Sequence, residues 1–405
     1  MLGSATCPTA RAASGTWNVD ADGNWSTGAN WTSDIADGAT STANLTFNLT
    51  GDRIVALDSS RSIGILNIGD TDATHSYTLA TSANTLTFDN GAADAQLNQI
   101  STSNGATISG LLAIAGNGKL TVTNAASAKT LTISASITSA LTSGTQTLTF
   151  NNANAVSVGG IIADGSSGGT LALTKTGAGT TTLTAANTYT GATTITQGTL
   201  ALSGGDNRLA TTGTLIFNGA SGTLDLGSTN QTLATIVMPS TLTSTATILG
   251  TGTLTLNGAS VQIGGTTGTQ TVNMAGLSNF IYDNAAGSFY VGGLANPANA
   301  VVTLAGTNVI TASTFGIASN SSVSDNGHPG TVRLGQTNTI NANTIQVGGT
   351  AGSGTLEFTT GLAPAPTLTI RGTGGTSTDR AALTVGNSAG FAATTSVFNM
   401  GTGVL

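Results

Sequence analysis

The sequence holds little charge, one cysteine, few prolines and few aromatic residues, and each shortage excludes a class of protein. Charged residues make up 7% of the 405 positions, against about 25% in an ordinary soluble domain. Glu357 is the single glutamate and lysine occurs three times, so the residues that favour helices are nearly missing. Because Cys7 is the single cysteine, no intrachain disulfide staples the fold. No run of about 18 apolar residues occurs, so the sequence predicts no membrane-spanning helix.

The charges that are present, with a net value of −7, are scattered along the chain. The ten lysines and arginines form no cluster, so nucleic acid is not an expected partner. Ten of the 17 acidic residues fall before residue 95, which makes the N-terminal part mildly acidic. His75 and His328 stand alone, with no cysteine or histidine at the spacing of metal ligands. The sequence therefore predicts no metal site, no cofactor and no catalytic residue.

Glycine, threonine, serine and asparagine take the place of the missing charges, and hydrophobic residues still reach 39%. Glycine, with 56 copies, and asparagine tolerate the backbone of tight turns, whereas branched threonine fits a pleated strand. A chain this apolar can bury a core. We therefore favour a folded all-β protein over the alternative of a disordered Gly/Ser/Thr-rich linker.

One strand pattern recurs along the chain: a threonine or other small polar residue, an aliphatic residue, any residue, and a second apolar residue. Apolar and polar positions alternate within it, so one face of each strand points inward and the other outward. The pattern stands at residues 85–88, 119–122, 130–133, 147–150, 170–173, 214–217, 223–226, 253–256, 331–334, 344–347, 355–358, 367–370 and 382–385.

Short turns separate most of these strand patterns, and no helical pattern lies between them. Parallel strands joined by short turns coil as a solenoid, in which each turn covers the apolar interior of its neighbour. We expect about 20–25 residues per turn and about 16–20 turns. A string of immunoglobulin-like sandwiches is the alternative, but it would need longer strands, more aromatic residues and proline-rich boundaries.

All three tryptophans, Trp17, Trp25 and Trp31, lie close together near the N-terminus. The first turn of a solenoid has no neighbour above it, so its apolar interior and its strand edge need a cover. We predict that the tryptophans form this cap, rather than a platform on which sugars stack. The resulting division is a leader remnant or disordered segment at 1–14, an N-terminal cap at 15–50 and the solenoid at 51–405.

The stretch from Gly169 to Leu202 repeats itself. It holds Gly-Thr-Leu-Ala-Leu at 169–173 and again at 198–202, with Thr-Thr-Leu-Thr at 181–184 and a turn on Asn187, Tyr189 and Gly191 between them. Over about 169–204 it resembles the autotransporter-associated β-strand repeat of passenger proteins on the surface of Gram-negative bacteria. The resemblance implies a single-stranded, right-handed parallel β-helix (β-solenoid) that is exported to the cell surface or the extracellular space.

Both ends of the sequence differ from that family context. Residues 1–9 lack the basic and apolar regions of a signal peptide, whereas Ala10-Arg11-Ala12 matches a cleavage site, so we expect an incomplete leader. The last residues, 400–405, read as the middle of a repeat. We therefore expect the sequence to be truncated at its C-terminus.

Parallel β-helices also include polysaccharide-degrading enzymes, whose sites need clustered carboxylates. Asp225 and Glu357 are expected about five turns, or about 25 Å, apart, which is too far for a glycosidase pair. Arg333 and Glu357 occupy equal places in the strand patterns 331–334 and 355–358. If that interval is one turn, the two side chains stack outside as a surface ion pair. Asp20-x-Asp22-Gly-Asn24 looks like half of a calcium loop, but without the later glycine and glutamate a polar turn is the prediction.

The expected function is structural or adhesive: an extracellular surface rod that binds through extended Thr, Ser and Asn faces. Polysaccharide, extracellular matrix or like chains are the expected partners, and membrane contact is expected only through a separate anchor. Two alternatives stay open, a polysaccharide-degrading β-helix enzyme and a passive stalk that spaces another domain. The Thr-x-Thr runs at 180–184, 241–247 and 251–255 suggest a third, an ice-binding ladder, although their irregular spacing argues against it.

Overall fold

The computed structural model describes residues 12–239, 243–264, 268–292, 299–319, 329–349, 352–386, 396–401 and 403. Its regular elements are β-strands and one short 3-10 helix, η1 (Gly28–Asn30), and these described parts contain no α-helix. Among them, we find no helix with the length and apolar character needed to span a bilayer. The strands form a parallel β-solenoid of about 13 turns, which confirms the predicted fold class. Residues 1–11 of the expected leader, Cys7 included, lie outside the described residues.

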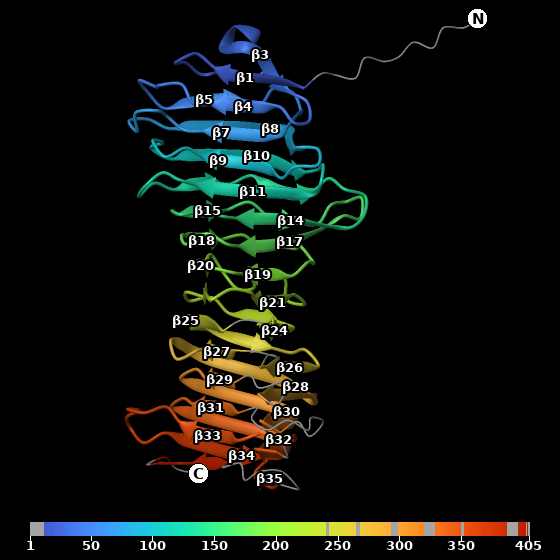
Figure 1. Ribbon diagram of the computed structural model, residues 1–405, viewed down its shortest axis with the longest axis vertical. Helices are drawn as coiled ribbons and strands as arrows, with labels where there is room; N and C mark the ends of the chain where they lie inside the picture. The colour runs from blue at the N-terminus through green and yellow to red at the C-terminus, as the bar shows by residue number, and fades with distance from the viewer. Residues whose placement is uncertain are drawn as a thin grey trace, which may run out of the picture. The chain divides into compact units, whose positions relative to one another are not determined.

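The chain divides into two compact units, unit 1 (Met1–Leu173 and Ala178–Thr181) and unit 2 (Thr174–Gly177 and Thr182–Leu405). In unit 1, one sheet follows the order β3, β1, β4, β7, β9, β11, β14, and Figure 1 shows β4 to β11 one below the next. Neighbouring strands of this sheet pair in parallel, except β1 and β3, which pair antiparallel. Its strands are β1 (Ala13–Trp17), β3 (Trp31–Asp37), β4 (Thr42–Leu45), β7 (Ile65–Ile68), β9 (Ala95–Gln99), β11 (Lys119–Asn124) and β14 (Thr145–Phe150).

The remaining strands of unit 1 line the other sides of the coil and pair in parallel as well. They are β2 (Gly23–Asn24), β5 (Arg53–Ala56), β6 (Arg61–Ile63), β8 (Tyr77–Phe88), β10 (Ala106–Ile114), β12 (Leu131–Ile133), β13 (Ser136–Ser139), β15 (Val156–Val158) and β16 (Ile162–Ala163). Two further strands, β17 (Thr170–Lys175) and β18 (Thr180–Leu183), contain residues of both units.

In unit 2, the two halves of the long strand β25 belong to different sheets. The first half of β25 pairs with β22 and β27, and its second half pairs with β23 and β28, all in parallel. The strands of unit 2 are β19 (Thr193–Ile195), β20 (Thr199–Leu202), β21 (Thr214–Phe217), β22 (Ser221–Asp225), β23 (Gln231–Leu233), β24 (Thr235–Val237), β25 (Ser244–Leu256), β26 (Ser260–Ile263), β27 (Thr269–Asn273), β28 (Leu277–Val291), β29 (Asn299–Thr303), β30 (Thr307–Ile317), β31 (Gly330–Leu334), β32 (Thr337–Val347), β33 (Gly354–Phe358), β34 (Thr367–Arg371), β35 (Ala382–Val385) and β36 (Val397–Asn399).

The core of each unit is a set of columns in which apolar residues of successive turns lie in register. One column of unit 1 consists of Leu79, Ile108, Ile133 and Val158, and each of the four is at most 1% exposed. Burial of one such side chain stabilises the fold by about 1.5–3 kcal/mol. In unit 2, Phe289 and Phe315 are register partners whose rings stack with centroids 5.8 Å apart. Each turn is therefore held mainly by the apolar surface of the next.

The expected turn length of about 20–25 residues is too short for much of the coil. Asn67 follows its partner Asn44 in the preceding turn by 23 residues, but Asn98 follows Asn67 by 31 residues. Strands keep their register while the turns between them take up the extra residues. About 13 turns therefore form, fewer than expected.

The three tryptophans lie together at the N-terminal end of unit 1. Trp17 and Trp25 are fully buried and Trp31 is 4% exposed. Their ring centroids lie 5.4 Å apart for Trp17 and Trp31 and 4.8 Å apart for Trp25 and Trp31. Each indole N–H donates to a backbone carbonyl, on Val19, Ala36 and Trp25 respectively. A platform for sugars needs an exposed ring face, so this arrangement fits the predicted cap over the first turn.

Lys175 lies on β17 on the same inward-facing side as Leu171 and Leu173, and it is fully buried. Its Nζ donates to the Gly177 carbonyl. Burial lowers the pKa of Lys175 from 10.5 to about 8, because the charged form loses its water shell. The folded state therefore carries an ammonium group in an apolar interior at neutral pH.

Lys175→Met is expected to raise the free energy of unfolding at pH 7 by about 2–3 kcal/mol, since it removes the cost of burying that charge. Between pH 8 and 10.5, Lys175 is protonated in the unfolded chain but largely neutral in the folded protein. The free energy of unfolding of the wild-type protein therefore rises with pH through that window. The difference in stability between wild type and variant becomes smaller accordingly. Urea unfolding at both ends of the window measures this. Lys129→Met, at an exposed position, is the matched control, and equal gains in both variants would contradict the prediction.

Candidate binding surface

A column of polar side chains crosses the outer face of the first sheet of unit 1. Its members are paired in register, one on each of β1, β4, β7, β9 and β11. All five are half-buried, whereas the residues on either side of each along its strand are buried, so the column faces outward. We call this column the outer ladder; it consists of Thr16, Asn44, Asn67, Asn98 and Thr123.

Hydrogen bonds join every neighbouring pair of the outer ladder. The Asn44 amide donates to Thr16 Oγ1 at 3.2 Å and the Asn67 amide donates to Asn44 Oδ1 at 2.8 Å. The Asn98 amide donates to Asn67 Oδ1 at 3.0 Å, and the Thr123 hydroxyl donates to Asn98 Oδ1 at 2.8 Å. These bonds fix the side chains of the outer ladder in one orientation.

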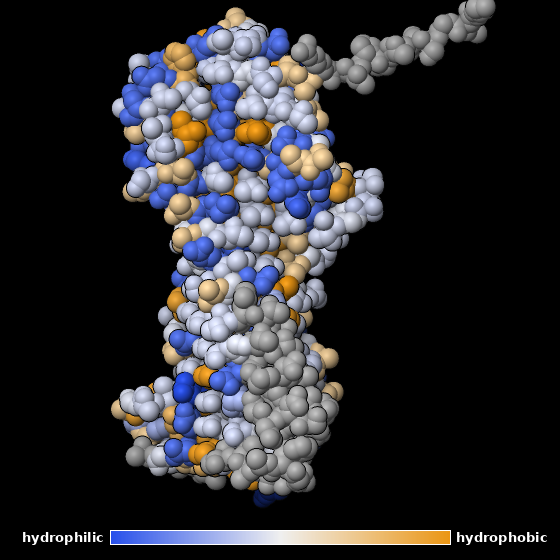
Figure 2. All heavy atoms as spheres, in the orientation of Figure 1, coloured by the Kyte–Doolittle hydropathy of each residue, from blue (hydrophilic) through white to orange (hydrophobic). Residues whose placement is uncertain are grey.

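A second outward column runs beside the outer ladder and is also uncharged. Its register partners are Thr42, Ile65, Gln96, Thr121 and Thr149. Gln96 lies close enough for its Oε1 to accept a hydrogen bond from the Asn98 amide at 3.1 Å. Figure 2 shows hydrophilic side chains gathered along the middle of this face of unit 1. The two columns together form an uncharged strip that is polar at every position except Ile65.

The sequence reasoning anticipated polar outer faces but missed this ladder. Each asparagine stands between two inward residues inside a strand, as in Ala43-Asn44-Leu45 and Leu66-Asn67-Ile68. An asparagine between two inward apolar residues of a strand was the sequence pattern that could have predicted the ladder. The unequal intervals between register partners hid it, because no fixed period connects Asn44, Asn67 and Asn98.

In unit 2, Arg333 and Glu357 lie where the sequence placed them. They are register partners on β31 and β33, and Arg333 Nε donates to Glu357 Oε1 at 3.0 Å. Both side chains face solvent, with 44% and 30% of their surface exposed. An exposed ion pair of this kind contributes at most about 1 kcal/mol. The predicted surface pair is confirmed, and with it the prediction that one turn separates these two positions.

Two outward threonine columns cross the same face of unit 2. Thr245 is in register with Thr271, and Thr247 is in register with Thr223 on one side and with Asn273 on the other; Thr241 lies outside the described residues. Irregular turn lengths do not break these columns, so the sequence argument from spacing was wrong. The columns are instead interrupted by Val301 and by the Arg333–Glu357 pair, and a flat, uniform threonine surface does not form there.

The acidic residues near the N-terminus join successive turns to one another. Asp20 accepts hydrogen bonds from Arg53 Nε at 2.7 Å and from the Thr50 amide, and Asp22 accepts from the Ile54 amide. The hydrogen bond from Arg53, followed by that from Thr50, lowers the pKa of Asp20 to about 2. Both carboxylates of the half calcium loop are thus engaged within a polar turn. Among the residues with described positions, no group of three His, Cys, Asp or Glu side chains is placed to hold a metal ion.

Asp70, which follows β7, is the fully buried member of this acidic group. Its oxygens accept from the backbone amides of Leu49, Thr74 and His75 at 2.9–3.1 Å. Burial is the largest single effect and favours the neutral carboxyl, but these hydrogen bonds together outweigh it and hold the pKa near 2. His75 is thereby part of a turn, and His328 lies outside the described residues.

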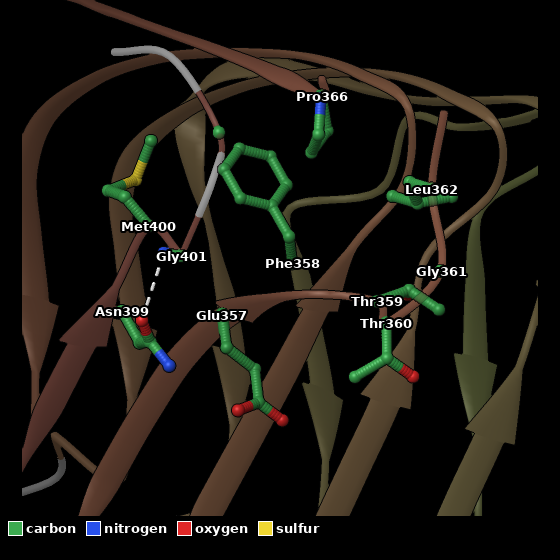
Figure 3. A pocket seen from close by; sticks show the side chains of 11 residues that line it. Glu357, Phe358, Thr359, Thr360, Gly361, Leu362, Pro366, Asn399, Met400 and Gly401 are labelled. Carbon is green, nitrogen blue, oxygen red and sulfur yellow. Dashed lines mark hydrogen bonds between the residues drawn. The ribbon is translucent and has the colours of Figure 1, made fainter. Parts of the chain in front are cut away.

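A pocket of about 260 Å³ lies among the loops after β33 and β36. Figure 3 shows the Phe358 ring between Met400 on one side and Leu362 and Pro366 on the other. Glu357 is the one carboxylate in its lining, and that carboxylate is paired with Arg333.

Asp225 and Glu357 lie on strands that are far apart in the coil. Asp225 lies on β22 and Glu357 on β33, and five successive register pairings separate these two strands. The pairings run from Thr223 on β22 through Thr247, Asn273, Thr303 and Arg333 to Glu357. The structure does not bring these two carboxylates together.

A family model described as the passenger-associated-transport-repeat matches residues 173–202. Neither the curated proteins nor the solved structures contain a match to this chain. The matched segment covers the end of β17 and all of β18, β19 and β20, and its Tyr189 is buried with its hydroxyl 2.6 Å from Thr193 Oγ1. This confirms the resemblance stated for residues 169–204. The matched repeat and the parallel β-solenoid together fit a repeat protein of the autotransporter passenger type.

Proposed function

We infer that this chain is an exported surface domain whose role is structural and adhesive. The matched repeat supports export and surface association. The observation that carries the adhesive role is the uncharged polar strip of unit 1, which presents hydrogen-bonding groups over five successive strands. Many weak contacts along such a strip act together, because each bound group holds its neighbours at high effective concentration.

An attachment assay tests this function directly. Beads that carry the purified protein are applied to surfaces coated with polysaccharide, with extracellular matrix or with the same protein. We expect attachment above that of beads carrying an unrelated protein of similar net charge. Beads that attach to none of the three surfaces would contradict adhesion and favour a passive stalk.

The same preparation tests the enzymatic alternative. We expect no release of reducing sugar from common polysaccharides at any pH between 4 and 9, because the role that we propose needs binding only. Sugar release that tracks the folded protein through purification would overturn this proposal. A Glu357→Gln variant would then show whether the carboxylate at the pocket of Figure 3 takes part.

A further inference from the structure

We propose that the outer ladder of unit 1 binds a neutral polysaccharide chain that lies along the coil. This inference rests on the proposed adhesive function and assigns it to one face and one class of ligand. It is carried by three features of the ladder: its spare hydrogen-bonding groups, their spacing and the absence of charge from the ladder and the column beside it, although the exposed ion pair of Lys119 and Asp94 lies next to that column.

The first feature is the set of groups left over after the ladder has formed. An asparagine amide has two N–H donors and two acceptor lone pairs. The ladder uses one donor and one acceptor site on Asn44 and on Asn67. Each of these two asparagines therefore keeps one N–H donor and one acceptor site for a ligand. Asn98 uses both donors and keeps one acceptor site. Sugar hydroxyl groups both donate and accept, and they match this mixed set.

The second feature is the spacing of the asparagines. Neighbouring strands of a sheet lie about 4.8 Å apart, so register partners repeat at that interval from one turn to the next. This interval is close to the length of one pyranose residue in an extended glycan. A chain that lies along the coil thus presents about one sugar to each turn. The ladder hydrogen bonds already hold the amides in place, so little side-chain entropy is lost on binding.

The third feature is the absence of any cation in the two outward columns. Neither column carries a lysine or arginine that could pair with an anionic glycan, and the chain has a net charge of −7. An anionic glycan would therefore be repelled by the net charge without a compensating ion pair at the strip, and a neutral glycan would not. The absence of charge on the strip therefore selects a neutral chain.

Co-sedimentation of the purified protein with insoluble polysaccharides tests this inference. Cellulose, chitin and mannan are the neutral probes, and calcium alginate and calcium polygalacturonate are the anionic ones. We expect binding to at least one neutral probe, with little dependence on salt, and at least a tenfold loss of affinity in Asn67→Val. Thr107→Val is the matched control, because Thr107 faces outward on β10, in a different sheet of the same unit. Asn44→Val provides a second test if Asn67→Val fails to fold by circular dichroism.

The outcomes separate this inference from the function on which it rests. Equal binding by wild type and by both ladder variants would place the glycan elsewhere and overturn the inference, while adhesion would stand. Binding to anionic probes alone, or bead attachment with no neutral polysaccharide bound, would do the same. If sedimentation velocity shows that Asn67→Val abolishes only self-association, the ladder is a contact between copies and the inference is wrong. Beads that attach to nothing would instead defeat the proposed function.

Discussion

Trp25→Ala is expected to lower the free energy that keeps the first turns of unit 1 closed by about 3–5 kcal/mol. The substitution removes a fully buried ring that lies 4.8 Å from Trp31. It also leaves the Ala36 carbonyl without the indole donor that now bonds it at 2.9 Å. A terminal turn has a neighbour on one side only, so it has less stacking energy to offset such a loss than a central turn has.

Hydrogen exchange measures this effect where it should occur. Backbone amides of β1, β3 and β4 are expected to exchange faster in Trp25→Ala by a factor on the order of a hundred or more. Amides of β14, four strands beyond β4 in the same sheet, serve as the internal control and should be unchanged. Trp25→Phe keeps most of the apolar surface and should lose about 1–2 kcal/mol. Uniform acceleration throughout unit 1 would show that the tryptophans do not act as a local cap.

Asp70→Ala is expected to destabilise unit 1 by about 3 kcal/mol or more, because it leaves buried backbone N–H groups without a hydrogen-bond acceptor. The amides of Leu49, Thr74 and His75 all donate to this one carboxylate. Urea unfolding at pH 7 measures the loss. The matched control is Asp52→Ala, since the Asp52 carboxylate is bonded only to Ser76 in the described structure and lies at the surface. A similar loss in both variants would contradict a special role for burial.

The pH dependence of stability gives a second readout for Asp70. Its folded pKa of about 2 lies below the ordinary value of 3.8, so its contribution is present above pH 3.8 and is lost as pH falls toward 2. That loss is worth about 2 kcal/mol. Asp70→Asn removes the titration, so its stability should vary less with pH than that of wild type over this window. A slope equal to that of wild type would show that other carboxylates carry the acid sensitivity.

The alternation of apolar and polar residues predicted the strands well, because a solenoid buries the same face of every strand. The patterns at 147–150, 214–217 and 355–358 each fall within a strand, in β14, β21 and β33. The same alternation placed Arg333 and Glu357 outside, where they pair. Lys175 was predictable by the same logic, since it follows Leu171 and Leu173 at intervals of two, but the usual preference of lysine for solvent conceals such a position.

The outer ladder and the number of turns did not follow from the sequence, for one physical reason. Strand pairing determines which residues are neighbours, and the pairing is kept when the loops between strands differ in length. Asn44, Asn67 and Asn98 lie side by side although the two intervals between them are unequal. A search for a constant period misses such columns and also miscounts the turns. The outer ladder became visible only once the register was known.

Because the coil accepts connecting loops of different length, its outside can be changed without disturbing its inside. The buried columns constrain a few positions in each strand, while the connecting loops can lengthen, shorten or change sequence without shifting any pairing. A protein built this way can change its outer loops and keep its scaffold intact. The same property makes these loops natural sites for grafting foreign peptides.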